Sequence, residues 1–319
     1  MGSASSRAAP IAIFAFRRPD HLRRTLTSLS GCTGLRDSPI FVFCDGPRTE
    51  RDLEDVAATR RVAREMLGRD AEYVFADTNL GLSRSIIRGV DEVLKRYDRV
   101  IVLEDDLHLT PSFLTFMNHA LERFADDARV FQVSGYQFDV PEFVGRARAL
   151  FLPMIVSWGW GTWRRAWSHF DSSAKGWERL LDDRTLRREF NLGGVYDFAT
   201  MLCQQMGGLR DSWAIRWYWS VFARGGLTLF PPVSLVTNTG LDGSGTHGRG
   251  RLRRFTARRP TVDGHDYALP ERSGIDPHDL AAVRNAIWGM NGRWLGATVD
   301  RMRWYRWRLA SAHVGAPRR

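Results

Sequence analysis

The chain has 319 residues, 44% of them apolar, which is enough for one large domain or two modest ones with a buried core. Its formal net charge of +10 comes almost wholly from arginine, since Lys95 and Lys175 are its only lysines. In a chain this rich in glycine and alanine, the use of arginine in place of lysine indicates a bias in overall composition and is weak evidence for a polyanion-binding function. We therefore expect no nucleic-acid partner, whereas phosphorylated small molecules or an anionic membrane surface are compatible with the charge.

The cysteines and the uncharged segments indicate the cellular compartment in which the protein is expected. Cys32, Cys44 and Cys203 are an odd number with no pair at metal-ligand spacing, which favours a reducing cytosol over a disulfide framework. Residues 1–9 are small and polar, so we expect them to be disordered and to form no signal peptide. The longest uncharged run, 149–163, is shorter than the roughly 20 residues of a membrane-spanning helix. We expect a cytoplasmic protein, with peripheral contact at the inner face of the membrane as a further option.

Strands and helices alternate through the first part of the chain. Short apolar runs predict the strands, and the amphipathic stretches behind them predict the helices. In chain order we expect strand 11–16, helix 21–30, strand 40–44, helix 48–67, strand 72–76, helix 84–97 and a strand that begins at Val100. This alternation predicts an α/β fold with a parallel, doubly wound sheet and right-handed crossovers.

The second part is less regular and rich in tryptophan. We expect strands 130–136 and 149–157, mostly helix over 170–224 with a break at 191–194, strand 227–238, a glycine-rich basic loop over 241–254 and a helical stretch over 282–309. Since no clean linker interrupts the chain, we predict a single compact domain over 10–255 and a basic, tryptophan-rich helical tail over 256–319.

The apolar run Val100–Leu103 leads directly into Glu104, Asp105 and Asp106. Buried parallel strands consist of continuous apolar runs, and ligands of open α/β sheets bind at the carboxyl ends of such strands. Three acids packed there repel one another, and a bound cation would compensate; oxygen ligands suit Mg²⁺ or Mn²⁺. The alternative is an acidic turn before a helix that Thr110 caps.

Four segments occur in the order and spacing of nucleotide-sugar glycosyltransferases of the GT-A fold. They are Phe14-Ala-Phe-Arg-Arg-Pro19, Val42-Phe-Cys-Asp-Gly46, Val102-Leu-Glu-Asp-Asp-Leu107 with Pro111 and Phe113, and Ser157-Trp-Gly-Trp-Gly-Thr-Trp163, and a fifth segment from Asp211 to His247 extends the match. The chain resembles this family over roughly residues 10–250, and especially bacterial relatives of N-acetylglucosaminyltransferase I. The resemblance implies a Rossmann-like, mixed, mostly parallel sheet flanked by helices, with a nucleotide-binding half (10–125) and an acceptor-binding half (126–255).

The resemblance also implies roles for individual residues. In the family the last acid of the motif, here Asp106, touches the metal; Asp105 would contact the ribose or the metal shell, and Glu104 would orient its neighbours. Asp45 matches the acid that binds the nucleotide base and favours UDP, although it also suits the capping of a turn before Gly46. Further donor-site candidates are Arg18, Asn79, Gly81, Arg84, Trp160 and Arg249, and His247 is a second candidate metal or phosphate contact.

The position of the catalytic base departs from the family pattern. An inverting transferase needs a carboxylate that takes the proton of the acceptor hydroxyl. The related pattern often has an aspartate directly after the tryptophan that matches Trp213, but here Ala214 stands there. We expect Asp211 to be the base, because in a helix it would share a face with Ala214, and we keep Asp242 in reserve.

These observations predict an inverting, Mn²⁺- or Mg²⁺-dependent hexosyl- or N-acetylhexosaminyltransferase of bacterial polysaccharide biosynthesis, with a UDP-sugar donor and a saccharide or lipid-linked acceptor. A nucleotidyltransferase or phosphatase is a weaker alternative: the first strand ends in Phe16-Arg-Arg18 without a nucleophilic aspartate, and no P-loop is present. A non-enzymatic protein that binds polyanions or membranes would explain the arginines but not the acids. The tail fits either a helix on an anionic bilayer or one packed on the domain.

Overall fold

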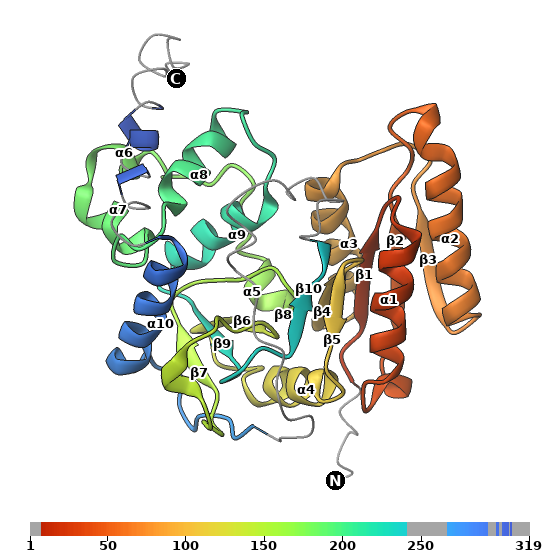
Figure 1. The fold of residues 1–319 in the computed structure, drawn as a ribbon, viewed down its shortest axis with the longest axis horizontal. Coiled ribbons are helices and arrows are strands. Elements are labelled where there is room, and N and C mark those ends of the chain that lie inside the picture. Colours follow the sequence, from red (N-terminus) through yellow and green to blue (C-terminus); the bar gives the residue numbers. More distant parts are fainter. Residues whose placement is uncertain (1–7, 241–266, 293–297, 300–301, 306, 308–319) are drawn as a thin grey trace.

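Short runs of apolar residues build the central sheet. A computed structural model describes residues 8–240, 267–292, 298–299, 302–305 and 307. Among these residues one mixed sheet contains, from edge to edge, β3 (Ala71–Phe75), β2 (Ile40–Cys44), β1 (Ile11–Ala15), β4 (Arg99–Glu104), β8 (Trp160–Trp163), β6 (Val130–Ser134), β9 (Leu227–Phe230) and β7 (Leu150–Leu152) (Figure 1).

Strand direction divides the sheet into two halves. β3, β2, β1 and β4 are mutually parallel, whereas β8 runs antiparallel to β4 and β6, and β7 runs antiparallel to β9. β6 and β9 are parallel to each other. The predicted fold class, a mixed and mostly parallel sheet flanked by helices, is therefore confirmed.

Helices flank the sheet. The parallel half carries α1 (Pro19–Ser30), α2 (Leu53–Leu67) and α3 (Leu82–Arg96), and the rest of the chain adds α4 (Phe113–Arg123), α5 (Arg164–Trp167), α6 (Arg179–Asp182), α7 (Arg184–Phe190), α8 (Phe198–Met206) and α9 (Trp213–Phe222). α1 packs on α2, and α3 packs on β1, β4 and α9. Gly89 permits this approach of α3, because a Cβ there would lie 2.5 Å from the ring of Phe14 and 3.1 Å from that of Phe43.

Two expected strands differ from the prediction, and two further strands were not predicted. The expected strand 227–238 is two strands, β9 and β10 (Val236–Asn238), because Pro231 and Pro232 lack the backbone N–H that a sheet ladder needs. β10 pairs antiparallel with β5 (Leu107–Leu109), a short strand that was not predicted. The strand expected over 149–157 is only β7, which ends directly before Pro153, and β8 was not expected at all.

The described part of the C-terminal tail packs against the rest of the chain. α10 (Pro277–Met290) buries Ala282, Val283 and Ile287. Further on, Trp304 is 8% exposed, and the Arg187 guanidinium lies 4.5 Å from its ring centroid. These contacts favour the packed tail over a helix that lies on a bilayer. No helix in the described ranges is long and apolar enough to cross a membrane.

Candidate functional site

The carboxyl ends of β2, β1 and β4 bring the predicted acids to one edge of the sheet. The three strands are parallel neighbours, with Ala15 opposite Cys44 and Phe14 opposite Glu104. Asp45 directly follows β2, the segment that carries Arg18 follows β1, and Asp105 and Asp106 follow β4. Residues that are distant in the sequence therefore meet where open α/β sheets bind their ligands.

Arg18 holds the two aspartates that follow β4. Its Nη2 donates a hydrogen bond to Asp105 Oδ1 and another to Asp106 Oδ2, the second at 3.0 Å. Asp105 Oδ2 also accepts from the backbone N–H of Phe16 at 3.4 Å. The two aspartates are 2% and 8% exposed, so this ion-pair cluster is nearly closed to water.

The cluster carries more negative charge than Arg18 compensates. Burial, together with the charges of Asp106 and Asp105, raises the pKa of Glu104 to about 8. Burial and the charge of Asp106 raise the pKa of Asp105 to about 6, even though Arg18 opposes the shift. Burial lowers the pKa of Arg18, but the two aspartates outweigh this and raise it above its ordinary value. An additional cation would relieve the repulsion among the carboxylates.

A threonine that sequence reasoning missed fixes the backbone of these acids. Thr25, on the buried face of α1, donates its hydroxyl to the backbone carbonyl of Asp105 at 2.8 Å and accepts the N–H of Leu107 at 3.1 Å. The signal in the sequence was a polar residue among Leu22, Leu26 and Leu29 on the apolar face of the predicted helix. Thr25 thus anchors the turn that presents Asp105 and Asp106.

The carboxylate of Asp106 fits a metal ligand. Its Oδ1 is buried and has no hydrogen-bond partner within the part of the chain that the structure describes. Its backbone carbonyl accepts from both the N–H and the hydroxyl of Thr239, at 2.7 and 3.0 Å, so the residue is held firmly. No three acidic, histidine or cysteine side chains gather as ligands among the described residues. Asp106 therefore fits a Mg²⁺ or Mn²⁺ site at which substrate phosphates and water would supply further ligands.

Gly240 shapes the space beside Asp106. A Cβ at this position would overlap Asp106 Oδ2 and lie 2.8 Å from its Cγ and 3.0 Å from its Cβ. We expect Gly240→Ala to lower the free energy of unfolding by about 1–3 kcal/mol, as overpacked sites do, because the carboxylate must shift. Chemical denaturation measures this loss. Gly274→Ala is the matched control, since no atom lies within 4 Å of its added Cβ. Equal stability of the two variants would contradict the close packing.

Asp45 organises the turn between β3 and α3. Its carboxylate accepts three backbone N–H groups, from Gly46 at 2.9 Å, Leu80 at 2.7 Å and Gly81 at 2.9 Å. Asn79 adds to the turn by donating to the carbonyl of Gly46 at 2.9 Å. These contacts match the turn-capping alternative for Asp45. Its contact with a nucleotide base stays a prediction, because three of its acceptor sites are already used.

Asp211 lies next to this turn. α9 begins only at Trp213, after the N-cap Ser212, so Asp211 precedes the helix and does not share a helical face with Ala214, contrary to our expectation. Its side chain is 64% exposed, and its Oδ1 lies 3.6 Å from Arg216 Nη2. A Cβ on Gly81, whose φ is +80°, would lie 3.9 Å from Asp211 Oδ2. An accessible carboxylate thus stands beside the turn that Asp45 holds.

The structure places Trp160 in the core, away from any ligand surface. Its side chain is fully buried, and its ring stacks on Trp213 at a centroid distance of 5.0 Å. The expectation that Trp160 contacts the donor is therefore not supported, because long-range packing of β8 on α9 closes off its ring. Asp242, His247 and Arg249 lie outside the described residues.

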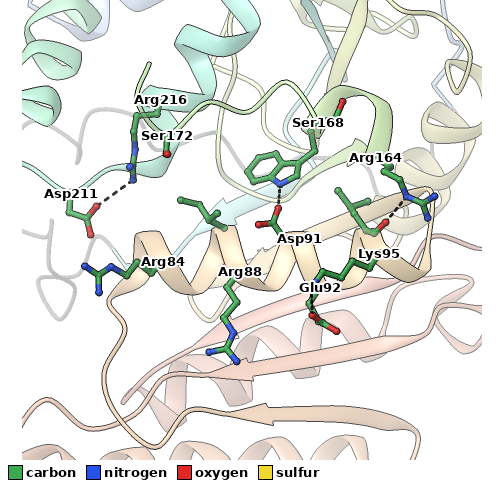
Figure 2. A pocket seen from close by; sticks show the side chains of 13 residues that line it. Arg84, Arg88, Asp91, Glu92, Lys95, Arg164, Ser168, Ser172, Asp211 and Arg216 are labelled. Carbon is green, nitrogen blue, oxygen red and sulfur yellow. Dashed lines mark hydrogen bonds and ion pairs between the residues drawn. The ribbon is translucent and has the colours of Figure 1, made fainter. Parts of the chain in front are cut away.

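A groove that the sequence did not indicate runs along α3. It has a volume of about 1160 Å³ and is lined by α3 together with residues of α5 and α9 and the segments next to them (Figure 2). Arg84 and Asp211 line it, whereas Asp105 and Asp106 do not. The groove therefore begins beside the turn at Gly81, which Asp45 holds, and the cluster of Arg18, Asp105 and Asp106 is not part of its lining.

Comparisons with known proteins give similarity in structure only. No family model and no curated protein matches the chain. The mannosyltransferase PcManGT from Pyrobaculum calidifontis, solved in complex with GDP-Man and Mn²⁺, is similar with a TM-score of 0.43 and 12% identity, covering 98% of this chain and 77% of that one. A putative nucleotide-diphospho-sugar transferase from Desulfovibrio desulfuricans G20 has a TM-score of 0.31 and 13% identity, covering 50% of this chain and 65% of that one.

A cytidylyltransferase from Leptospira borgpetersenii is also similar, with a TM-score of 0.28 and 16% identity, covering 40% of this chain and 52% of that one. The chain thus spans less than two thirds of the length of the Desulfovibrio and Leptospira proteins. All three TM-scores lie below 0.5, so these likenesses add nothing to the argument about activity.

Proposed function

We propose that the chain is a metal-dependent glycosyltransferase that moves a sugar, with inversion, from a UDP-sugar to a saccharide or lipid-linked acceptor. One observation carries the proposal: the buried Oδ1 of Asp106, which has no partner among the described residues, lies beside the Asp105–Arg18 pair at the carboxyl ends of β4 and β1. A buried carboxylate oxygen without a donor is costly unless a cation or a ligand satisfies it. The excess negative charge of the same cluster favours the cation.

Each residue of the cluster at the end of β4 would have its own role in binding the donor. When Mn²⁺ or Mg²⁺ is bound, it offsets the negative charge that grows on a diphosphate leaving group. Asp106 Oδ1 would be a protein ligand of the ion. Arg18 and the Phe16 N–H fix the carboxylate of Asp105 for contact with the ribose or the ion's hydration shell, and Glu104 supports its neighbours from the end of β4.

The acceptor side would use Asp211. An accessible carboxylate can accept the proton of an attacking hydroxyl, and the ion pair with Arg216 orients it beside the Gly81 turn. Asp242 remains the reserve candidate. Asp45, Asn79 and Gly81 form the rigid turn between the two sides, and Arg84 stands at the start of α3.

The wider assignments belong to the same proposal. We assign the catalytic domain to residues 10–255, with the donor half over 10–125 and the acceptor half over 126–255, followed by the tail over 256–319. The sequence motifs support a relationship with bacterial relatives of N-acetylglucosaminyltransferase I. A hexosyl or N-acetylhexosaminyl donor and a role in polysaccharide biosynthesis belong to that relationship, and the sparse cysteines favour a cytoplasmic location.

Calorimetric titration with nucleotide sugars tests the proposal. The panel contains UDP-glucose, UDP-N-acetylglucosamine, GDP-mannose and a CDP-linked sugar, each titrated with Mn²⁺ and again with EDTA. We expect a UDP-sugar to bind in the presence of Mn²⁺ and its affinity to fall at least tenfold in EDTA. Binding that ignores the metal, or no binding of any member, would count against the proposal. Phosphate release from simple esters, or pyrophosphate release from a nucleoside triphosphate with a sugar phosphate, would favour the other two enzyme classes.

A further inference from the structure

The groove along α3 runs from the Gly81 turn towards the C-terminal end of the helix. It begins beside Asp211 and Arg84, near the turn of Gly81, and extends to Lys95 and Arg164 (Figure 2). Arg164 pairs with Asp98, which directly precedes β4 and therefore lies at the opposite end of that strand from Asp105. The lining residues of α3, from Arg84 to Lys95, span about 17 Å along the helix at 1.5 Å per residue. The groove thus leads away from the acidic cluster for a distance that suits an extended ligand.

Most charges in this groove are already compensated. Lys95 pairs with Glu92 at 3.0 Å, and Arg216 donates to Ser83 and lies 3.6 Å from Asp211. The carboxylate of Asp91 accepts the indole N–H of Trp167 at 2.7 Å. These pairs hold the walls of the groove and leave little capacity for binding another charged molecule.

Arg84 and Arg88 are the exception. Both are exposed, both line the groove, and neither forms an ion pair or hydrogen bond with any residue in the described ranges. They stand four residues apart on α3, a spacing at which like charges on a helix repel each other mildly. Their side chains extend from α3 in different directions (Figure 2), so each guanidinium offers its own contact to an oxyanion, because the planar donor fork matches phosphate and carboxylate geometry.

We propose that the acceptor is an anionic saccharide whose phosphate or carboxylate groups bind Arg84 and Arg88, while its reacting hydroxyl lies at the Asp211 end of the groove. This inference depends on the proposed function and adds the chemical class of its acceptor. It moves Arg84 from the donor to the acceptor side. The donor phosphates are assigned to the cluster of Arg18, Asp105 and Asp106, which does not line this groove.

Binding to a saccharide array tests the inference without knowledge of the acceptor. The full-length protein is applied, without nucleotide, to immobilised neutral oligosaccharides, uronic-acid oligosaccharides and sugar phosphates. We expect binding to anionic members only, and the type that binds distinguishes a carboxylate from a phosphate. The variants R84Q and R88Q should each weaken this binding about tenfold, the effect of one lost charge-assisted hydrogen bond.

R96Q is the matched control, because Arg96 also belongs to α3 but pairs with Glu72 at 2.7 Å and does not line the groove. Its array binding should equal that of the unmodified protein. Equal binding of neutral saccharides, no binding of any saccharide, or unchanged binding by the R84Q/R88Q double variant would each overturn the inference. Calorimetry of R88Q with Mn²⁺ and the UDP-sugar keeps the two proposals separate: an unchanged affinity agrees with an acceptor role, and a tenfold loss would return these arginines to the donor site.

Discussion

Asp106→Asn is expected to abolish the metal-dependent part of donor binding. The substitution keeps the volume of the side chain, and an amide oxygen can still accept the hydrogen bond of Arg18. It removes the negative charge and the anionic oxygen at Oδ1, which has no other partner among the described residues. Even residues that only orient metal ligands cost about 10- to 100-fold in affinity when replaced, so we expect a loss of about a hundredfold or more. Calorimetric titration of the UDP-sugar with Mn²⁺ measures it.

Asp98→Asn is the control for this variant. Asp98 precedes the same strand at its other end, and its side chain is 89% exposed. The donor affinity of the Asp98→Asn variant and the Mn²⁺ dependence of that affinity should match those of the unmodified protein. Thermal melting of both variants shows whether a loss of donor binding comes from the missing carboxylate or from unfolding. We expect Asp106→Asn to remain folded. If folded Asp106→Asn binds the donor as tightly as before, Asp106 is not the metal ligand.

Asp211→Asn is expected to reduce sugar transfer by about 10²- to 10⁴-fold, the usual contribution of a general base. Donor binding should stay within twofold, because Asp211 belongs to the groove and does not contact the acidic cluster in any described interaction. The exposed ion pair with Arg216 contributes at most about 1 kcal/mol, so the variant should melt close to the unmodified protein. Single-turnover transfer with saturating donor measures the rate.

The comparison for Asp211 is again Asp98→Asn. Both aspartates are exposed, and both pair with an arginine, Asp98 with Arg164 at 3.0 Å and Asp211 with Arg216 at 3.6 Å. Loss of a surface ion pair alone would affect the two variants alike. Full transfer activity in Asp211→Asn would assign the base to another carboxylate, with Asp242 as the next to replace.

Local patterns predicted the parts of the fold that local chemistry determines. The run Val100–Leu103 is 0–1% exposed in β4, as a continuous apolar run before three acids indicates. Helix α1 begins at Pro19, a residue suited to the first turn of a helix, two positions before the predicted start. The pairing of Arg18 with Asp105 could also have been predicted, because the carboxyl ends of neighbouring parallel strands lie at the same edge of the sheet.

Contacts between distant segments were not predictable in the same way. Trp160 was a donor-site candidate, yet its ring is buried against α9, which begins more than 50 residues further along the chain. Asp45 was recognised as a turn residue and as a base-binding candidate. That it accepts the N–H groups of Leu80 and Gly81, 35 and 36 residues away, follows only from the pairing of β2 with β3. The groove along α3 has no sequence signature, because separate segments form its walls.

Anomalous diffraction from a crystal grown with Mn²⁺ and a UDP-sugar tests the central claim most directly. We predict one manganese peak in contact with Asp106 Oδ1 and the diphosphate of the nucleotide next to it. A nucleotide bound elsewhere on the chain, or a manganese peak that leaves Asp106 Oδ1 without a contact, would contradict it.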